Sequence, residues 1–233
     1  FLNGYPTSEP EGKQASRLRA VSIASDCEPA VRSNVEGAVH QAFPVAQLYW
    51  RTALRAYIAI AKRHLLDESF LIVDMGVADT HLVSVHEGSV EQLVVPEGTR
   101  TILSRFAKNR QPEEVLGYLR MLSRDACSSE SCESLKQAVA TAEPELVRVF
   151  GEAIAKIATR NKVPNNVLLI THSQITSWLA GFLARIDFAQ FTLTSMPLSV
   201  HTGESLDISK WVIATEPSEA SSLEAALVNI ESR

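Results

Sequence analysis

The sequence predicts an α/β protein with a mixed β-sheet, and three observations support this fold class. Helix-like and strand-like periodicities alternate along most of the chain. Residues 70–75, "FLIVDM", form a nearly continuous apolar run, which is typical of a strand buried at the centre of a sheet. Two further strand-like segments follow this run with no helix between them, so the sheet is expected to contain antiparallel as well as parallel pairs.

The first part of the chain is expected to alternate strands and helices. Val31, Val35 and Val39 recur four residues apart and would form one stripe of an amphipathic helix, with Pro29 suited to its first turn. The expected elements are an exposed loop at 3–16, a strand at 17–25, a helix at 28–43, a strand at 45–50 and a helix at 52–65.

The middle of the chain predicts a strand meander and then helices. Glu87-Gly88 separates two strand-like segments and suits a tight hairpin. Helices are expected at 99–109 and 112–124, followed by a polar loop at 126–134. The helical pattern over 135–160 contains Pro144, which is expected to divide it into a short and a long helix. The remaining expected elements are a strand at 166–171, a helix at 175–185, a strand at 188–200 and a helix at 219–231.

Composition excludes several classes of protein. The 233 residues are 45% apolar and carry a net charge of −5, so a dedicated nucleic-acid binder with a basic surface is not expected. No apolar run reaches the roughly 20 residues that a membrane span needs, and no signal peptide is visible. We therefore expect a cytoplasmic protein without a membrane segment. Because the chain begins with Phe1 and not with Met, we expect it to be a fragment of a longer protein.

The three cysteines are Cys27, Cys127 and Cys132. An odd number at this spacing does not suggest a disulfide framework, and no CxxC motif or nearby histidine suggests a metal site. The prediction is three free thiols in a reducing cytoplasm.

The stretch "LIVDMGVADTHLVSVHEGSV", residues 71–90, raises the question of function. A buried strand ends at Asp74, polar residues run through Asp79 and Thr80, and an apolar run then resumes. This is either an ordinary hairpin, since Asp and Gly suit turns for dihedral reasons, or a loop that holds phosphate and a metal ion. Asp74 is suited to Mg²⁺, Gly76 permits close approach of the backbone to a phosphate, and turn N–H groups can bind anions. Asp79 and Thr80 are candidates for contacting phosphate or positioning water.

The spacing D-x-G-x-x-x-T from Asp74 to Thr80, within a strand meander, resembles the second phosphate-binding element of the actin, sugar-kinase and heat-shock-ATPase superfamily. More specifically, the chain is similar to FtsA-type and PilM-type actin-like proteins. The segment "LNGYPTSEPEGKQASRLRAVSIAS" looks like the strand-bearing end of the extra subdomain that marks this branch, and "VLLITHSQITSWLAGFLA" occupies the place of the adenosine-binding strand, loop and helix. The resemblance implies an actin-like (ribonuclease H-like) second lobe with a mixed sheet at 67–233. Residues 1–66 would be the remainder of the first lobe and its inserted subdomain.

The resemblance also implies a ligand and partners. ATP with Mg²⁺ would bind at the lobe interface through Asp74, Gly76, Asp79, Thr80, Gly98 and Ser173, with Asp74 as the metal ligand. The protein would be an assembly scaffold of cell division, at most a slow ATPase. Its partners would be copies of itself and a cytoskeletal or membrane-machinery protein.

Departures from the family pattern leave other functions open. Val77 and Ala78 stand where relatives carry glycine, and Thr171-His172-Ser173-Gln174 replaces a glycine pair after the adenosine-binding strand. The alternatives are a nucleotide-free protein-interaction module and a PilM-like component of a pilus or secretion assembly. A small-molecule kinase or phosphatase of the superfamily is a third, although no acidic base for sugar binding stands in a matching context.

Overall fold

The structure is a computed structural model, and its described residues fall into two compact units, 1–55 and 56–233. The division lies within helix α2 (Ala53–His64), ahead of the boundary at residue 66 that the family resemblance implies. The structure describes residues 2–3, 5, 7, 10–18, 26–64, 69–86, 89–107, 110–124, 126–158, 162–186, 196–203, 205–206 and 226. Most of the strand expected at 17–25 and almost all of the helix expected at 219–231 lie outside these residues.

In the first unit, the helix expected from the valine stripe is present as α1 (Pro29–Ala42). The strand expected at 45–50 was wrong: these residues are described and adopt neither helix nor strand. Val45 is 96% exposed, so its side chain has no sheet or core to pack against. The segment instead folds back on α1, where the indole Nε1 of Trp50 donates to the Glu36 carboxylate at 2.9 Å.

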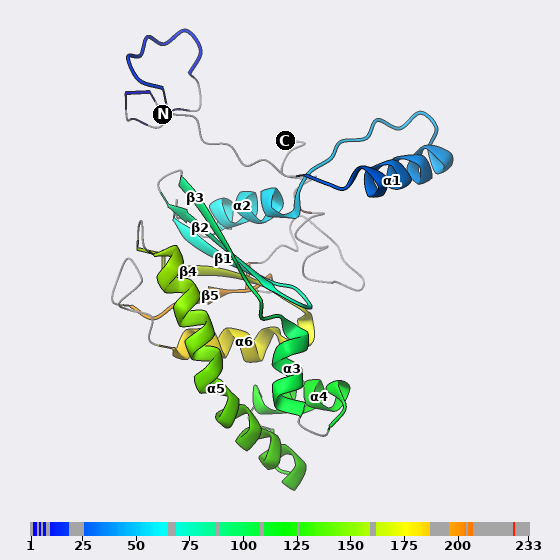
Figure 1. Ribbon diagram of the computed structural model, residues 1–233, viewed down its shortest axis with the longest axis vertical. Coiled ribbons are helices and arrows are strands. Elements are labelled where there is room, and N and C mark those ends of the chain that lie inside the picture. The colour runs from blue at the N-terminus through cyan, green and yellow to red at the C-terminus, as the bar shows by residue number, and fades with distance from the viewer. Residues whose placement is uncertain are drawn as a thin grey trace. The chain divides into compact units, whose positions relative to one another are not determined.

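The second unit is built on a five-stranded mixed sheet of order β3-β2-β1-β4-β5 (Figure 1). β1 pairs antiparallel with β2 and parallel with β4, and β2–β3 is antiparallel while β4–β5 is parallel. The sheet is mixed and carries helices, so the predicted α/β fold class with a mixed sheet is confirmed. The strands are β1 (Phe70–Met75), β2 (Thr80–His86), β3 (Ser89–Val95), β4 (Asn166–Ile170) and β5 (Ser199–His201).

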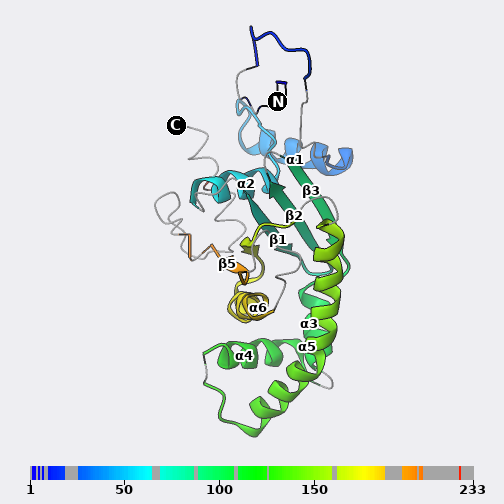
Figure 2. The same cartoon turned by 90° about the vertical axis from the view of Figure 1, so that its left-hand side faces the viewer.

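Four helices lie on one side of this sheet and form the main hydrophobic core with it (Figures 1 and 2). Alternate residues of β1, Leu71, Val73 and Met75, point into this core, because successive side chains of a strand project to opposite faces. Phe70 and Ile72 project to the other face and are also fully buried. The helices are α3 (Thr99–Ala107), α4 (Pro112–Leu122), α5 (Glu130–Ile157) and α6 (Ser173–Arg185). Helices α5 and α6 contact the strands, whereas α4 packs on the other three helices.

Helix α5 is continuous through Pro144, so the predicted break was wrong. A proline inside a helix removes one backbone hydrogen bond and costs about 3 kcal/mol. Both Pro144 and Ala140, whose carbonyl loses its donor, are exposed, so water can solvate that carbonyl. Leu135 on one side of the proline and Phe150 on the other are both buried in the same core, and this packing holds the helix together.

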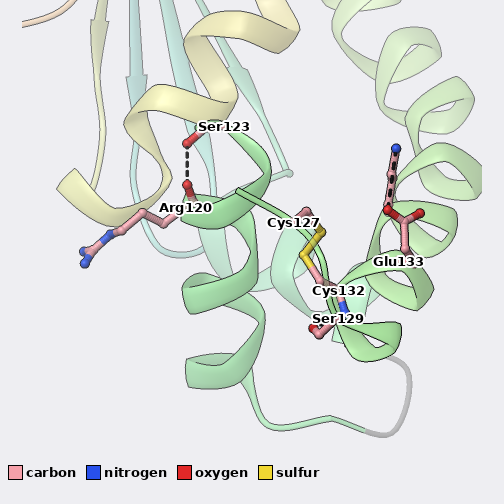
Figure 3. Close-up of a disulfide and its surroundings, with 7 residues drawn as sticks. Arg120, Ser123, Cys127, Ser129, Cys132 and Glu133 are labelled. Carbon is pink, nitrogen blue, oxygen red and sulfur yellow. Dashed lines mark hydrogen bonds and ion pairs between the residues drawn. A yellow bond between two sulfur atoms is a disulfide. The ribbon is translucent and has the colours of Figure 1, made fainter. Parts of the chain in front are cut away.

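The cysteine prediction was also wrong for two of the three residues. Cys127 and Cys132 form a disulfide (Figure 3). Cys27 is a free, exposed thiol. Helix α5 begins at Glu130, inside the expected polar loop, and its first turn brings the two Cα atoms to 5.6 Å, within the usual range for disulfides. The prediction failed because it was based on the number and spacing of the cysteines. It did not consider that the first turn of a helix can bring two cysteines five residues apart close together.

None of the described helices combines the length and apolarity that a membrane-spanning helix requires.

Candidate functional site

The candidate site is the connection between β1 and β2. Met75 and Thr80 form the last register pair of the two strands, so residues 76–79 make the turn. The N–H of Gly76 donates to the Asp79 carbonyl at 2.8 Å and closes the turn. Gly76, Val77 and Ala78 are exposed, so the tip of the turn is accessible.

The N-terminus of helix α3 holds this turn by its carbonyl groups. The N–H of Thr99 donates to the Gly76 carbonyl at 3.0 Å, and that of Arg100 donates to the Val77 carbonyl at 2.9 Å. The first amides of a helix have no partner within the helix, so these two bonds satisfy both partners at once. They also fix the orientation of two successive peptide groups.

That orientation presents two backbone donors to solvent. In a trans peptide the N–H points opposite to the C=O, and the described chain contains no cis peptide. The amides of Val77 and Ala78 share peptide groups with the two held carbonyls, so both point away from α3. Neither amide finds an acceptor among the described residues. Adjacent outward N–H groups of this kind form an anion-binding concavity.

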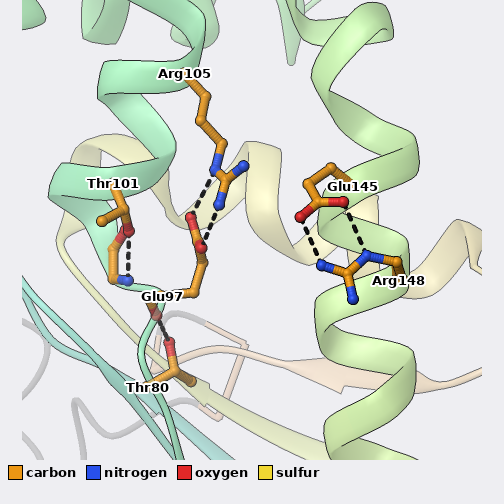
Figure 4. A network of polar contacts seen from close by, with 7 residues as sticks. Thr80, Glu97, Thr101, Arg105, Glu145 and Arg148 are labelled. Atoms are coloured by element: carbon orange, nitrogen blue, oxygen red, sulfur yellow. Dashed lines mark hydrogen bonds and ion pairs between the residues drawn. The ribbon is translucent and has the colours of Figure 1, made fainter.

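Gly98 and Thr80 support the turn from its buried side. A Cβ at Gly98 would lie 2.6 Å from backbone atoms of Val77, Ala78 and Asp79, so any side chain there would displace the turn. The Thr80 hydroxyl is fully buried and donates to the Glu97 carbonyl at 2.5 Å (Figure 4). The structure therefore places these two sequence-predicted residues behind the turn, where neither presents a side chain to an external ligand.

A charged network anchors the segment that carries Gly98. The buried Glu97 carboxylate accepts two hydrogen bonds from the Arg105 guanidinium of α3, at 3.0 and 2.8 Å. The hydrogen bonds that Arg105 donates to Glu97 raise the pKa of Arg105, so its guanidinium stays charged. On the facing surface of α5, Arg148 pairs with Glu145 and lowers the pKa of that carboxyl (Figure 4). Sequence reasoning missed Glu97 and Arg105, although a glutamate directly before a turn glycine was a usable signal.

Two carboxylates flank the turn. Asp74 is half-buried and lies opposite His81 in the β1–β2 register. Asp79 is half-exposed, with its carboxylate 3.6 Å from the His81 ring, and the other ring nitrogen of His81 lies 3.1 Å from the Gln92 amide. Two acidic groups beside outward N–H donors disfavour a bare phosphate, because like charges repel. A phosphate carrying a divalent cation would relieve this repulsion.

The described residues fit a magnesium–phosphate complex better than a cage made only of protein ligands. They include no group of three or more His, Cys, Asp or Glu side chains placed to hold a metal ion. Mg²⁺ is commonly bound by one or two carboxylates, with water and phosphate oxygens completing its octahedron. Asp74, alone or with Asp79, matches that mode.

The other sequence-predicted residue, Ser173, lies at the same edge of the sheet. β4 is parallel to β1 with Ile170 in register with Asp74, so the segment after β4 begins beside the β1–β2 turn. Ser173 is exposed as the first residue of α6. His172 caps this helix: its Nδ1 accepts from the Gln174 N–H at 3.4 Å, which keeps the ring over the helix N-terminus.

No protein-family model and no curated protein sequence matches the chain. Among solved structures, the ethanolamine utilization protein EutJ from Carboxydothermus hydrogenoformans is 18% identical with a TM-score of 0.44, covering 74% of this chain and 53% of that one. A PilM–PilN type IV pilus biogenesis complex is 16% identical with a TM-score of 0.48, and the match covers 76% of this chain and 50% of that one. Bacillus thuringiensis ParM with ATP is 12% identical with a TM-score of 0.42, and the match covers 71% of this chain and 48% of that one. The chain spans about half the length of these structures, and likeness at such identities concerns the fold and not the chemistry.

Proposed function

We propose that residues 67–233 are the second lobe of an actin-like assembly protein that binds Mg-ATP weakly at the β1–β2 turn. The nucleotide would lie between this lobe and a first lobe with its own phosphate loop. Binding would draw the lobes together and so control self-association and contact with a cytoskeletal or membrane-machinery protein in the cytoplasm. Any hydrolysis would be slow, serving to reset the assembly.

One observation carries this proposal: the amides of Val77 and Ala78 point outward together. An ordinary hairpin turn needs no helix to hold its carbonyls. Here α3 holds two of them through Thr99 and Arg100, and Gly98 allows the close approach this requires. This support gives the turn a fixed set of donors before any ligand arrives, and pre-organisation of this kind strengthens binding.

Asp74 would hold the magnesium ion, directly or through water, while the two amides take phosphate oxygens. The bound cation would offset the acidic surroundings of the turn. Gly76 leaves the tip of the turn open for this contact, and Asp79 would position water or stay paired with His81. Ser173 would contact the nucleotide from the neighbouring strand.

A specific observation favours a second candidate, a nucleotide-free protein-interaction module. Val77 is 56% exposed at the tip of the turn, where a glycine would leave the backbone accessible to a ligand. His172 also occupies the helix end where a purine would approach. A partner protein could use the same outward donors and this exposed apolar side chain.

A thermal-shift measurement on the full-length protein separates the candidates. At an Mg-ATP concentration about a hundred times the dissociation constant, binding stabilises the folded protein by about 2.7 kcal/mol. We expect a rise in Tm with millimolar Mg-ATP, a smaller rise with ATP and EDTA, and none with Asp74→Asn. Absence of any rise in the wild-type protein would favour the interaction module.

Glu114→Gln on α4 is the matched control, since it also removes one carboxylate but lies at an exposed helix position away from the turn. Its response to Mg-ATP should equal that of the wild type. Equal loss of response in both variants would mean that net charge, and not Asp74, governs binding.

A further inference from the structure

The disulfide between Cys127 and Cys132 joins the connection between α4 and α5 to the first turn of α5 (Figure 3). Cys132 lies in the first turn of α5, where its N–H donates to the Ser129 hydroxyl that caps the helix. Cys127 lies in the connection that follows α4. The bond therefore closes a short loop around the capping residue, and this loop has no part in the candidate nucleotide site.

The two sulfur atoms are in unequal environments. Cys132 is fully buried next to the core residue Leu135, whereas Cys127 is only partly buried in the connection between helices. An incoming thiolate must approach the sulfur that it attacks, so access selects Cys127. The sulfur that leaves is then Cys132, whose negative charge would develop in the first turn of a helix, where the helix dipole stabilises anions.

We propose that Cys127–Cys132 is a reversible redox-modification site whose outer sulfur, Cys127, exchanges with small-molecule thiols such as glutathione. The thiolate of one glutathione attacks Cys127 Sγ, the protein disulfide breaks, and Cys132 leaves as a thiolate. A second glutathione attacks the glutathione sulfur of this mixed disulfide and releases Cys127 as a thiolate. The products are the protein dithiol and one oxidised glutathione, so two electrons pass from glutathione to the protein.

The structural consequence of reduction is local. Oxidised protein has the connection 126–129 tied to the first turn of α5, which keeps Ser129 at its capping position. Reduction removes this covalent tie and leaves the cap and the packing of Leu135 to hold the helix start. We expect the connection between α4 and α5 to open more often in the reduced protein, without unfolding of the sheet, because none of the five described strands lies in or next to this connection.

Peptide mapping tests the chemistry directly. Trypsin releases residues 125–136 as one peptide with both cysteines, because cleavage sites flank it at Arg124 and Lys136. The native protein, with Cys27→Ser to remove the third thiol, is oxidised with glutathione disulfide, treated briefly with glutathione and quenched with iodoacetamide. We expect the trapped intermediate to carry glutathione on Cys127 and the alkyl group on Cys132.

Matched single-cysteine variants give the control. In the same Cys27→Ser background, Cys132→Ser leaves Cys127 alone and Cys127→Ser leaves Cys132 alone. We expect native Cys127 to react with glutathione disulfide on the order of tenfold faster than native Cys132, and the two to react equally in denaturant, where burial is lost. Glutathione found on Cys132, or equal native rates, would overturn the assignment of the attacked sulfur. A peptide that stays in the dithiol form after oxidation would overturn the site itself.

Limited proteolysis tests the structural consequence on the same samples. Arg124 is exposed in the turn after α4, so trypsin cleavage there reports opening of the connection. The reduced protein should be cut on the order of tenfold faster at Arg124 than the oxidised protein, because the closed loop restricts local opening. Equal cutting in both states would show that the disulfide does not control this connection.

Discussion

Gly98 packs directly on the backbone of Ala78: a Cβ built at Gly98 would lie 2.6 Å from the Ala78 carbonyl carbon. This contact joins the segment before α3 to the tip of the β1–β2 turn. It explains why α3 can reach the carbonyls of Gly76 and Val77 with its first amides. The geometry of the candidate site therefore depends on the absence of a side chain at a position outside the turn.

Gly98→Ala should destabilise the second unit by about 1–3 kcal/mol, as overpacking does when the neighbours are backbone atoms that cannot move aside. Because the turn must shift, the variant should also lose any stabilisation by Mg-ATP. Urea unfolding with and without Mg-ATP measures both effects.

Gly117→Ala is the matched control, because nothing lies within 4 Å of the added Cβ and the residue is inside α4. It should raise the free energy of unfolding by about 0.5–1 kcal/mol through better helix propensity. If both glycines tolerated alanine equally, the contact between Gly98 and the turn would not matter for stability.

His172→Gly should increase the Tm rise produced by Mg-ATP. Glycine is also a good N-cap residue, so α6 should lose only a few tenths of a kcal/mol while the imidazole leaves the helix N-terminus. His172→Asn keeps a side-chain cap and serves as the control with intermediate bulk. An unchanged Mg-ATP response in both variants would argue against docking of a purine at this helix end.

Pro144→Ala should stabilise the protein by about 1–3 kcal/mol. The substitution restores the hydrogen bond from residue 144 to the Ala140 carbonyl in the middle of α5, and it removes a clash without altering buried packing. Chemical denaturation measures the change. Thr141→Ala, at a nearby exposed position of the same helix, should change stability by less than about 0.5 kcal/mol. A destabilised Pro144→Ala variant would mean that the helix path requires the proline.

Because of His201, the free energy of unfolding should decrease as the pH falls below 6.5. Burial lowers the pKa of this histidine in the folded protein from its ordinary value of 6.5. The unfolded chain therefore binds the proton more readily, so the stabilisation is complete above pH 6.5 and is lost as the pH falls below it towards the folded pKa.

His201→Gln should reduce the slope of unfolding free energy against pH between about pH 7 and pH 5, measured by urea unfolding at each pH. A slope that persists in His201→Gln would assign the pH dependence to other groups.

Local pattern predicted most of the second unit, because its signals are strong over short distances. The run 70–75 and the helices near residues 99, 112 and 175 lie close to where apolar periodicity placed them. Predictions failed where the outcome depended on contacts distant in sequence. Residues 45–50 have a strand-like composition but pair with no strand in the described part of the chain. Helix α5 continues through Pro144 because its two halves pack in the same core.

The sequence by itself determined the mixed sheet, the carboxylate at the end of β1 and the short motif from Asp74 to Thr80, since these follow from periodicity and residue type along a few neighbouring positions. Only the tertiary structure decided what each motif residue does. Thr80 and Gly98 turned out to support the turn, while Thr99 and Arg100 orient its peptides. It also paired Cys127 with Cys132. The physical reason is that hydrogen bonds and steric contacts between separate elements depend on distances that spacing along the chain does not specify.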